Sequence, residues 1–202
     1  MSNPESAPRY RRYTRGQRRA MLIDAGMRCL AQGGITHFTV DNVIKEAGVS
    51  RGLITHHFQS MDSLLEAIYS TLYEGMFAQL IPAGAEPPTL AAMIDAVFDE
   101  KLFTRANLTL WLSFWGEIAT NPKLRDAHRH HYKKYRDLLA QAVANAAKSQ
   151  SRDVDAQTLA IMLISLIDGL WLEQSMDDGL MSAEAAKSMC RKMLAAHLGD
   201  ID

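Results

Sequence analysis

The amino-acid sequence predicts an all-α protein of nine helices, in which a small helix-turn-helix head precedes a larger helical body. Apolar residues recur at three- and four-residue spacing along most of the chain. Beyond Pro88, no stretch shows the alternating pattern of a strand with turn residues on both sides. Around Gly48, a short turn joins two segments that each have one apolar face, which is the pattern of a helix-turn-helix.

The composition is that of an ordinary globular protein. With 202 residues, 48% hydrophobic and 22% charged, the chain suffices for one or two domains with a sizeable core. Cys29 and Cys190 lack metal-ligand spacing, so we expect packed cysteines rather than a redox pair. There is no apolar leader and no unbroken run of about eighteen apolar residues, which predicts a cytoplasmic protein with no membrane partner.

Charge is distributed unevenly along the chain. Residues 1–60 hold nine Lys/Arg and four Asp/Glu, whereas the remainder holds thirteen and nineteen. A basic front joined to an acidic remainder predicts a DNA-binding domain at 1–60 and an effector-binding and dimerisation domain at 61–202. The arginines before Arg15, interleaved with Pro4 and Pro8, predict an arm that is disordered without DNA and follows phosphates on it; the alternative is a solvated tail.

The first four helices follow from capping signals. The first is expected at about 15–32, where Gly33 and Gly34 end it. Thr39 is a good N-cap for the second helix, and Gly48 ends that helix because glycine adopts the left-handed conformation without a Cβ penalty. Ser50 is then expected to cap the third helix. The fourth begins near Ser60 and stops at the proline-rich stretch 82–88, which predicts a hinge between head and body.

Five further helices are expected in the body. Asn121 followed by Pro122 is a cap with proline at the first helical position, and residues 148–153 form a polar loop. We place these helices at about 89–103, 105–119, 122–148, 154–176 and 182–198.

The expected helix at 154–176 is apolar on more than one face, so it must be covered twice. One stripe can meet the body's own core, and the last helix at 182–198 also offers apolar residues. We therefore expect a homodimer through these two helices, with two recognition helices about 34–36 Å apart on one face of DNA. The alternative is a monomer that covers both stripes internally. The stripes are Leu159, Leu163, Leu166, Leu170 and Ala160, Ile164, Ile167, Trp171.

The third helix has an N-terminal end free of bulky apolar residues, which suits insertion into the major groove of DNA. An ordinary helical hairpin is the alternative, and the basic charge of the head favours DNA. The head resembles the TetR family of one-component repressors. The matching residues are Thr39, Val43-Ile44, Ala47-Gly48-Val49-Ser50, Gly52, Leu53-Ile54, Phe58 and Ser60.

The body resembles the BetI-type branch of that family, which senses choline. The similar segments are WLSFWGEIATNPKLR from Trp111 and LIDGLWLEQSM from Leu166. The resemblance implies a repressor that binds palindromic double-stranded operator DNA as a dimer and is released by a small molecule. It implies no enzymatic activity and no cofactor.

Carried over position by position, the resemblance also implies the DNA contacts. The residues expected to contact phosphates are Thr39, Ser50, His56 and His57. The residues expected to contact base edges are Arg51, Gly52 and Thr55. Thr55 stands where many members carry tyrosine, although the BetI branch has a small hydroxyl residue there. Met61 stands where many members carry lysine, so we carry no phosphate contact over to it.

Aromatic residues in the body suggest an effector site. Trp111 and Trp115 are four residues apart and so share a helix face, with Phe114 beside both; Asp168 and Trp171 share a face on a later helix. Two such helices could enclose a quaternary ammonium ion, with Asp168 or Glu117 supplying charge. The alternatives are that the tryptophans are core residues or that Trp171 lies in the dimer interface. The expected ligand-binding residues are Trp111, Phe114, Trp115, Asp168 and Trp171.

Three rival functions remain at this stage. The protein could be a TetR-like repressor that senses an unrelated hydrophobic ligand. It could be a metal-binding protein or enzyme that uses His128 and His131, which share a helix face near Asp126, although neighbouring basic residues favour a solvated face. It could also be a helical interaction module that never meets DNA, which salt-dependent binding to random duplex would distinguish.

Overall fold

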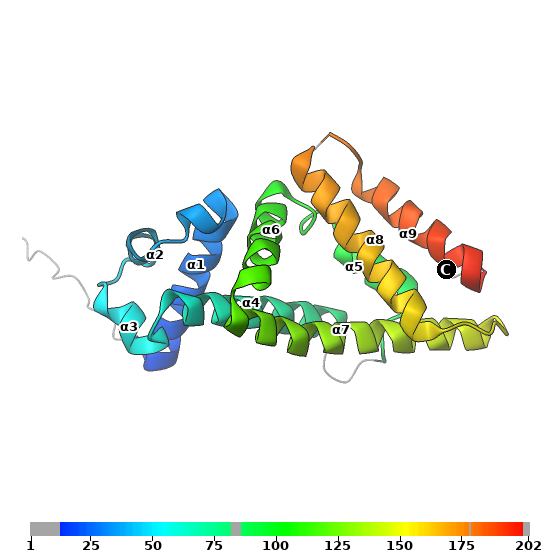
Figure 1. Cartoon of the computed structure of the whole chain (residues 1–202), viewed down its shortest axis with the longest axis horizontal. Coiled ribbons are helices and arrows are strands. Elements are labelled where there is room, and N and C mark those ends of the chain that lie inside the picture. Colours follow the sequence, from blue (N-terminus) through cyan, green and yellow to red (C-terminus); the bar gives the residue numbers. More distant parts are fainter. Residues whose placement is uncertain (1–12, 82–85, 178, 200–202) are drawn as a thin grey trace, which may run out of the picture.

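The computed structural model describes residues 13–81, 86–177 and 179–199. Within these ranges the chain forms nine α-helices and no strand, which confirms the predicted fold class (Figure 1). The arginine-rich arm predicted for the first dozen residues lies outside the described residues. The helices are α1 (Arg15–His37), α2 (Val40–Ala47), α3 (Gly52–Phe58), α4 (Met61–Leu80), α5 (Leu90–Val97), α6 (Arg105–Thr120), α7 (Pro122–Ser149), α8 (Ala156–Met176) and α9 (Ala183–Leu198).

Two of the three predicted cap signals in the helix-turn-helix are confirmed. The Thr39 hydroxyl accepts a backbone hydrogen bond at the start of α2, and Gly48 ends α2 with a left-handed φ of 65°. The predicted cap by Ser50 is wrong, because Arg51 already has helical backbone angles and no side chain caps α3. Instead, the Leu53 amide donates to the Ser50 carbonyl at 3.0 Å, so the backbone alone starts the helix.

Of two further predicted helix ends, one is confirmed and one is wrong. The regular helix that begins α1 is interrupted at Gly33 and Gly34 as predicted, because both glycines have non-helical backbone angles and Gly34 has a φ of 65°. A short helical stretch follows as far as His37, in which the Thr36 hydroxyl donates to the Gly33 carbonyl at 3.1 Å. The helix expected at 89–103 ends at Val97. A turn follows in which the Asp99 carboxylate accepts the Lys101 amide at 2.9 Å. This local side-chain bond competes with continued helix.

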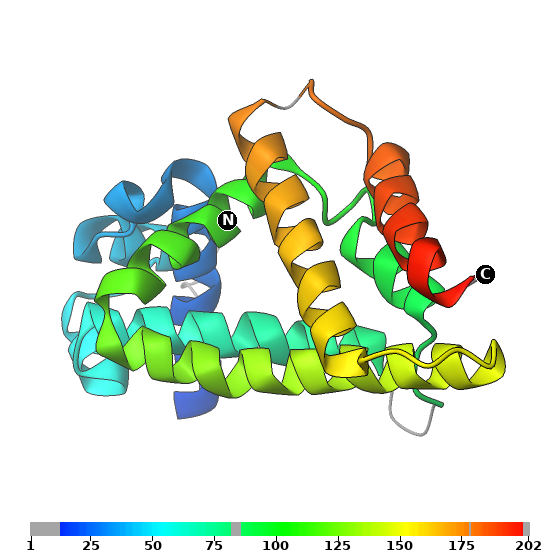
Figure 2. The same ribbon diagram turned by 45° about the vertical axis from the view of Figure 1, so that its right-hand side comes forward.

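The long helices α4 and α7 lie side by side and form the axis of the molecule (Figures 1 and 2). α1 packs against α2, α4 and α6, so the head is attached to the body by two helices. α1 approaches α4 closely at Gly26, where an added Cβ would lie 2.5 Å from the Ile68 Cδ1 atom. α8 packs against α6, α7 and α9 at the opposite end from α3 (Figure 1).

The two apolar stripes of α8 that led us to expect self-association are largely covered within the chain. Every residue of both stripes is buried except the half-buried Leu166. The apolar residues left in solvent belong to a third face, which the sequence pattern did not single out. We call this the outer face of α8: Ile161, Met162, Leu172 and Met176, which are 38–63% exposed.

Among the described helices, α8 is the one that is long and apolar enough to cross a membrane by length and composition. Its most apolar window has a mean hydropathy of 1.4, and 39% of that window is buried inside the fold. The contacts of α8 with α6, α7 and α9 show that it serves as a core helix here.

Candidate nucleic-acid interface and effector cavity

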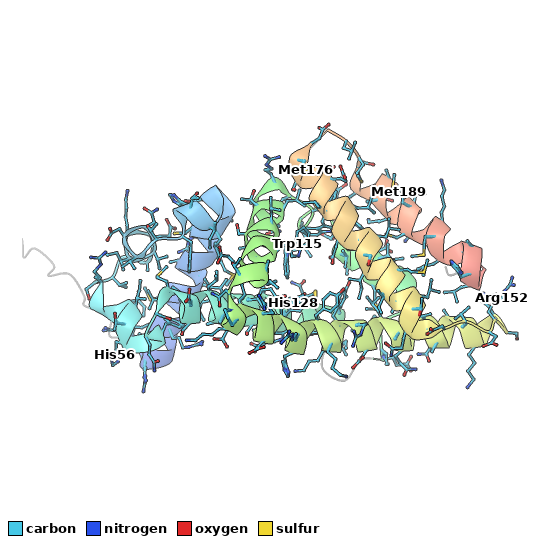
Figure 3. The ribbon with its side chains drawn as sticks, in the orientation of Figure 1. His56, Trp115, His128, Arg152, Met176 and Met189 are labelled. Atoms are coloured by element: carbon cyan, nitrogen blue, oxygen red, sulfur yellow. The ribbon has the colours of Figure 1, made fainter. Side chains whose placement is uncertain are left out.

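α3 presents a polar face to solvent. Ile54 and Phe58 are buried on its inner side, whereas Gly52, Thr55 and His56 are exposed and His57 is half-buried. Figure 3 shows His56 at the end of the molecule farthest from α9. The helix is therefore anchored through its apolar side and leaves the residues predicted to contact bases accessible.

Arg51 is held at the start of α3 by an ion pair. Its Nη2 atom lies 3.1 Å from the Oδ1 atom of Asp41 on α2, and both side chains are more than two-thirds exposed. Exposed pairs of this kind contribute roughly 0–1 kcal/mol. Arg51 is thus oriented in the free protein at little cost and can exchange Asp41 for another partner.

The start of α1 adds positive charge beside α3. The pKa of His57 is lowered by its burial and by the positive field of His56 and of arginines on α1. The Arg19 guanidinium lies 4.9 Å from the centre of the Phe58 ring. Sequence reasoning counted these arginines in the charge of the head but did not place them next to the recognition helix. They are Arg15, Arg18 and Arg19.

The body forms a partly open cavity of about 300 Å³, lined chiefly by α4, α6, α7 and α8. Its wall is largely apolar, with six aromatic side chains, and Figure 3 shows two lining residues, Trp115 on α6 and His128 on α7. The aromatic residues are Tyr73, Trp111, Trp115, Tyr132, Tyr135 and Trp171.

Four of the five predicted ligand-binding residues lie on this cavity: Trp111, Trp115, Asp168 and Trp171. The fifth, Phe114, is fully buried and does not line it; its ring packs 5.0 Å from that of Tyr69. The Phe114 ring also packs edge to face against that of Trp111, with the ring centres 6.2 Å apart, so Phe114 supports the wall from behind. Trp171, 8% exposed, faces the interior of its own chain. Glu117 does not line the cavity.

Asp168 is the acidic side chain on the cavity wall. No hydrogen bond or ion pair to its carboxylate occurs among the described residues. Burial raises its pKa from 3.8 to about 6, because desolvation disfavours the charged form. The carboxylate lies close enough to Tyr73, Tyr132 and Tyr135 to raise their pKa values. The cavity therefore combines aromatic rings with an acid that has no counter-charge.

The histidines of the metal hypothesis have other partners. His128 Nδ1 lies 2.8 Å from the Tyr69 hydroxyl, and His131 Nε2 lies 3.2 Å from the Ser70 hydroxyl. Burial lowers the pKa of both imidazoles. Within the described ranges, no group of three or more His, Cys, Asp or Glu side chains is placed to hold a metal ion. The two histidines thus join α7 to α4.

Sequence reasoning missed the tyrosines of the cavity. Tyr132 and Tyr135 are three residues apart on α7, and Tyr73 follows Tyr69 by four residues on α4. This spacing places each pair on one helix face, which was the available signal. The spacing alone could not identify the cavity, because aromatic residues at helical spacing are typical of any core.

A basic helix-turn-helix carried on a helical body with a cavity of small-molecule size defines a ligand-responsive transcriptional regulator. Comparison with known proteins gives its family. Residues 22–68 match the model for bacterial regulatory proteins of the tetR family, and residues 88–199 match the model for the C-terminal domain of BetI-type transcriptional repressors. The chain belongs to the TetR family and carries a BetI-type C-terminal domain.

Individual relatives agree with this assignment. The chain is 32% identical to the HTH-type transcriptional regulator BetI of Escherichia coli (strain K12), over 90% of this chain and 94% of that one. A transcriptional regulator from Pseudomonas aeruginosa PAO1 superposes with a TM-score of 0.80 at 31% identity, covering 94% of each chain. A regulator from Saccharomonospora viridis, solved in complex with choline, has the same fold at 22% identity (TM-score 0.77, 90% and 97% covered).

The matched family models and relatives are named as transcriptional repressors or regulators rather than as enzymes.

The raised pKa of Asp168 predicts a pH-dependent stability. Between pH 4 and 6 the folded chain holds a proton that the unfolded chain releases, so stability is lost as pH rises through this window. Asp168→Asn should remove that loss and leave the ligand-free protein more stable at pH 8, by up to about 3 kcal/mol. Urea unfolding of the wild type and of Asp168→Asn at pH 4.5 and pH 8 measures this difference in the free energy of unfolding.

Glu173→Gln is the matched control, because Glu173 lies on the exposed side of the same helix. If Asp168→Asn and wild type lose stability equally between the two pH values, the carboxylate is not desolvated in the fold.

Proposed function

We propose that this repressor binds its operator as a homodimer and releases it when a choline-like quaternary ammonium ion enters the cavity. The observation that carries the proposal is Asp168, a desolvated acid without a counter-charge inside an aromatic cavity. A cation would supply the missing charge, and aromatic faces would replace the water that it loses.

The size and chemistry of the cavity support this ligand class. Cation–π contacts contribute about 0.5–2 kcal/mol each, and several rings are available. A trimethylammonium group also offers no hydrogen-bond donor, which suits a wall that is mostly apolar. The choline complex of the Saccharomonospora viridis regulator and the 32% identity to BetI support the same class.

An unrelated hydrophobic ligand is the second candidate, favoured by the aliphatic part of the wall. Met27, Leu72, Met76 and Ile164 all line the cavity. A neutral apolar ligand would leave the Asp168 carboxylate desolvated and unpaired, which is costly. The acid therefore favours a cation.

At the operator, we assign base-edge contacts to Arg51, Gly52 and Thr55, which start α3. Thr39, Ser50, His56 and His57 are assigned to phosphates. Arg51 would exchange its ion pair with Asp41 for guanine, which presents two acceptors in the major groove.

For the dimer, we assign the outer face of α8 together with α9. Four large apolar side chains are exposed on this face of α8, and Met189 on α9 is 44% exposed (Figure 3). Ser165 and Gly169 lie on the same side of α8 and would let a partner helix approach closely. We assign the repressor to the cytoplasm, where its operator lies.

The coupling between ligand and DNA would pass through α4 and α6. Both helices line the cavity, and both contact α1. A ligand shifts such an equilibrium only through unequal affinity for the two states, and couplings of about 1–3 kcal/mol are usual. Release on binding follows if the ligand favours a head spacing that does not match the operator.

Arg51→Ala should weaken operator binding by about 1–3 kcal/mol and relax discrimination at one base pair per half-site. His56→Ala, a phosphate contact in this assignment, should weaken all sequences alike. Fluorescence anisotropy with the operator and with single-base variants measures both. If Arg51→Ala weakens every sequence by the same factor, Arg51 contacts phosphate rather than a base.

Choline should quench or shift tryptophan fluorescence, because Trp111, Trp115 and Trp171 all line the cavity. It should also release operator DNA over the same concentration range. Asp168→Asn should raise the choline concentration needed by about tenfold or more, since a desolvated charge pair is lost. If choline gives no fluorescence change and no DNA release at millimolar concentrations, the choline proposal fails and repression stands.

A further inference from the structure

Two histidines of α7 make hydrogen bonds to α4 where these two long helices lie side by side, a contact that we call the α4–α7 seam. The Nδ1 atom of His128 lies 2.8 Å from the Tyr69 hydroxyl. The Nε2 atom of His131 lies 3.2 Å from the Ser70 hydroxyl. Tyr69 and His131 are buried, and His128 is half-buried. The seam therefore contains two imidazole rings, a group that can take up a proton near neutral pH.

The seam accommodates neutral imidazole rings better than charged ones. A neutral ring can accept the proton of a buried hydroxyl, whereas imidazolium can only donate. The His131 ring also stacks on the Tyr73 ring, with the ring centres 5.3 Å apart and an angle of 19° between the planes. Burial is the largest cause that lowers the pKa of both histidines. A proton on either ring in the closed seam costs free energy, which contact with water would recover.

The charges that act on the two rings are mainly positive. The Glu74 carboxylate on α4 favours a proton on His131, and three side chains of α7 oppose protonation of one ring or the other. Asp168 on α8 acts on the tyrosines of the seam, and α6 contributes aromatic rings around Tyr69. Protonation of both histidines would therefore add charge to a region that is already basic on its α7 side. The three α7 side chains are Arg129, His130 and Lys134.

The seam is continuous with the support of the head. Ile68 precedes Tyr69 on α4, and its Cδ1 atom lies at the close approach to Gly26 of α1. α1 in turn packs against α2 of the helix-turn-helix. Because such interiors are close-packed, a displacement of α4 at the seam would displace α1 as well. An operator with a fixed half-site spacing binds one placement of the two heads, so this displacement would weaken DNA binding.

We propose that His128 and His131 make the α4–α7 seam a proton-sensitive joint, so that acidification loosens the seam and lowers operator affinity without any ligand in the cavity. Neutral rings hold α4 in the position that matches the operator. Protonated rings favour a looser packing in which water reaches them, and the heads then leave that position. The inference concerns operator binding by the ligand-free repressor, so it stands or falls independently of the ligand proposed for the cavity.

Operator binding by the full-length, ligand-free protein at about pH 7.5 and about pH 5.5 tests the proposal, with fluorescence anisotropy at constant ionic strength. A histidine whose pKa is lowered in the operator-binding state stabilises that state above its ordinary pKa of about 6.5, and this contribution is lost as the pH falls below it. On acidification, wild type should lose about fivefold or more in affinity relative to the variant His128→Gln/His131→Gln, whose side chains stay polar but take up no proton.

Control variants separate the seam from other groups that titrate in this range. His130→Gln removes an exposed histidine beside His131 and should keep most of the wild-type pH dependence. Asp168→Asn removes the carboxylate whose pKa is about 6 and should keep it too. His56 and His57 on α3 are present in every variant, so the effect of their protonation next to DNA cancels in the comparison.

An NMR titration of the histidine rings in wild type, with and without operator DNA, gives a second measurement that needs no variant. Because linkage is reciprocal, operator binding should lower the pKa of His128 and His131. This titration decides the point if the double glutamine variant does not bind operator at about pH 7.5.

Three results would each overturn the proposal. The first is an equal pH dependence of operator affinity in wild type and in the double glutamine variant. The second is a pH dependence that Asp168→Asn abolishes, because the carboxylate would then be the sensor. The third is an operator that leaves the pKa of both histidines unchanged.

Discussion

The placement of the half-buried Asp168 carboxylate among aromatic side chains is the constraint on which the rest of the body depends. A carboxylate in an aromatic environment without a counter-charge costs free energy, which an apolar residue at this position would avoid. The surrounding helices do not relieve this cost. α4 and α7 bring tyrosines and α6 brings tryptophans, whereas two cationic side chains of α7, Arg129 and Lys133, form ion pairs on the exposed side of that helix. The body therefore keeps a destabilising unpaired charge, which a cationic ligand would pair in the function we propose.

The same helices that form the cavity also carry the head. α4 provides Leu64 and Ile68 to the core beneath the helix-turn-helix, and two turns later it provides Tyr73 and Met76 to the cavity wall. α6 packs against the kinked end of α1, where a Cβ on Gly34 would lie 3.4 Å from the Ser113 hydroxyl. Because these interiors are close-packed, a shift at the cavity is passed on rather than absorbed. In the proposed mechanism, the position of α3 would therefore depend on what the cavity holds.

Local sequence signals predicted the fold class and most helix boundaries, whereas features that depend on tertiary packing could not be predicted from them. Thr39 and Gly48 define α2 through bonds within a few residues of themselves, so the sequence alone locates them. Ser50 carries a similar signal, yet α3 starts through its backbone. The stripes of α8 correctly predicted a helix covered on two sides, but only the packing of α6, α7 and α9 shows that both are covered internally and that a third face is exposed. Trp111 and Trp115 were found by spacing, whereas the tyrosines required the fold.

The central claim is that occupancy of the cavity sets the distance between the two heads. A spin label on Asp24→Cys measures it, because Asp24 is exposed on α1 whereas Cys29 and Cys190 are buried and should not react. Electron–electron double resonance on the labelled dimer gives the distance between the heads with and without choline. We expect this distance to shift at the choline concentrations that release DNA. An unchanged distance in a protein that binds choline and releases its operator would contradict this claim.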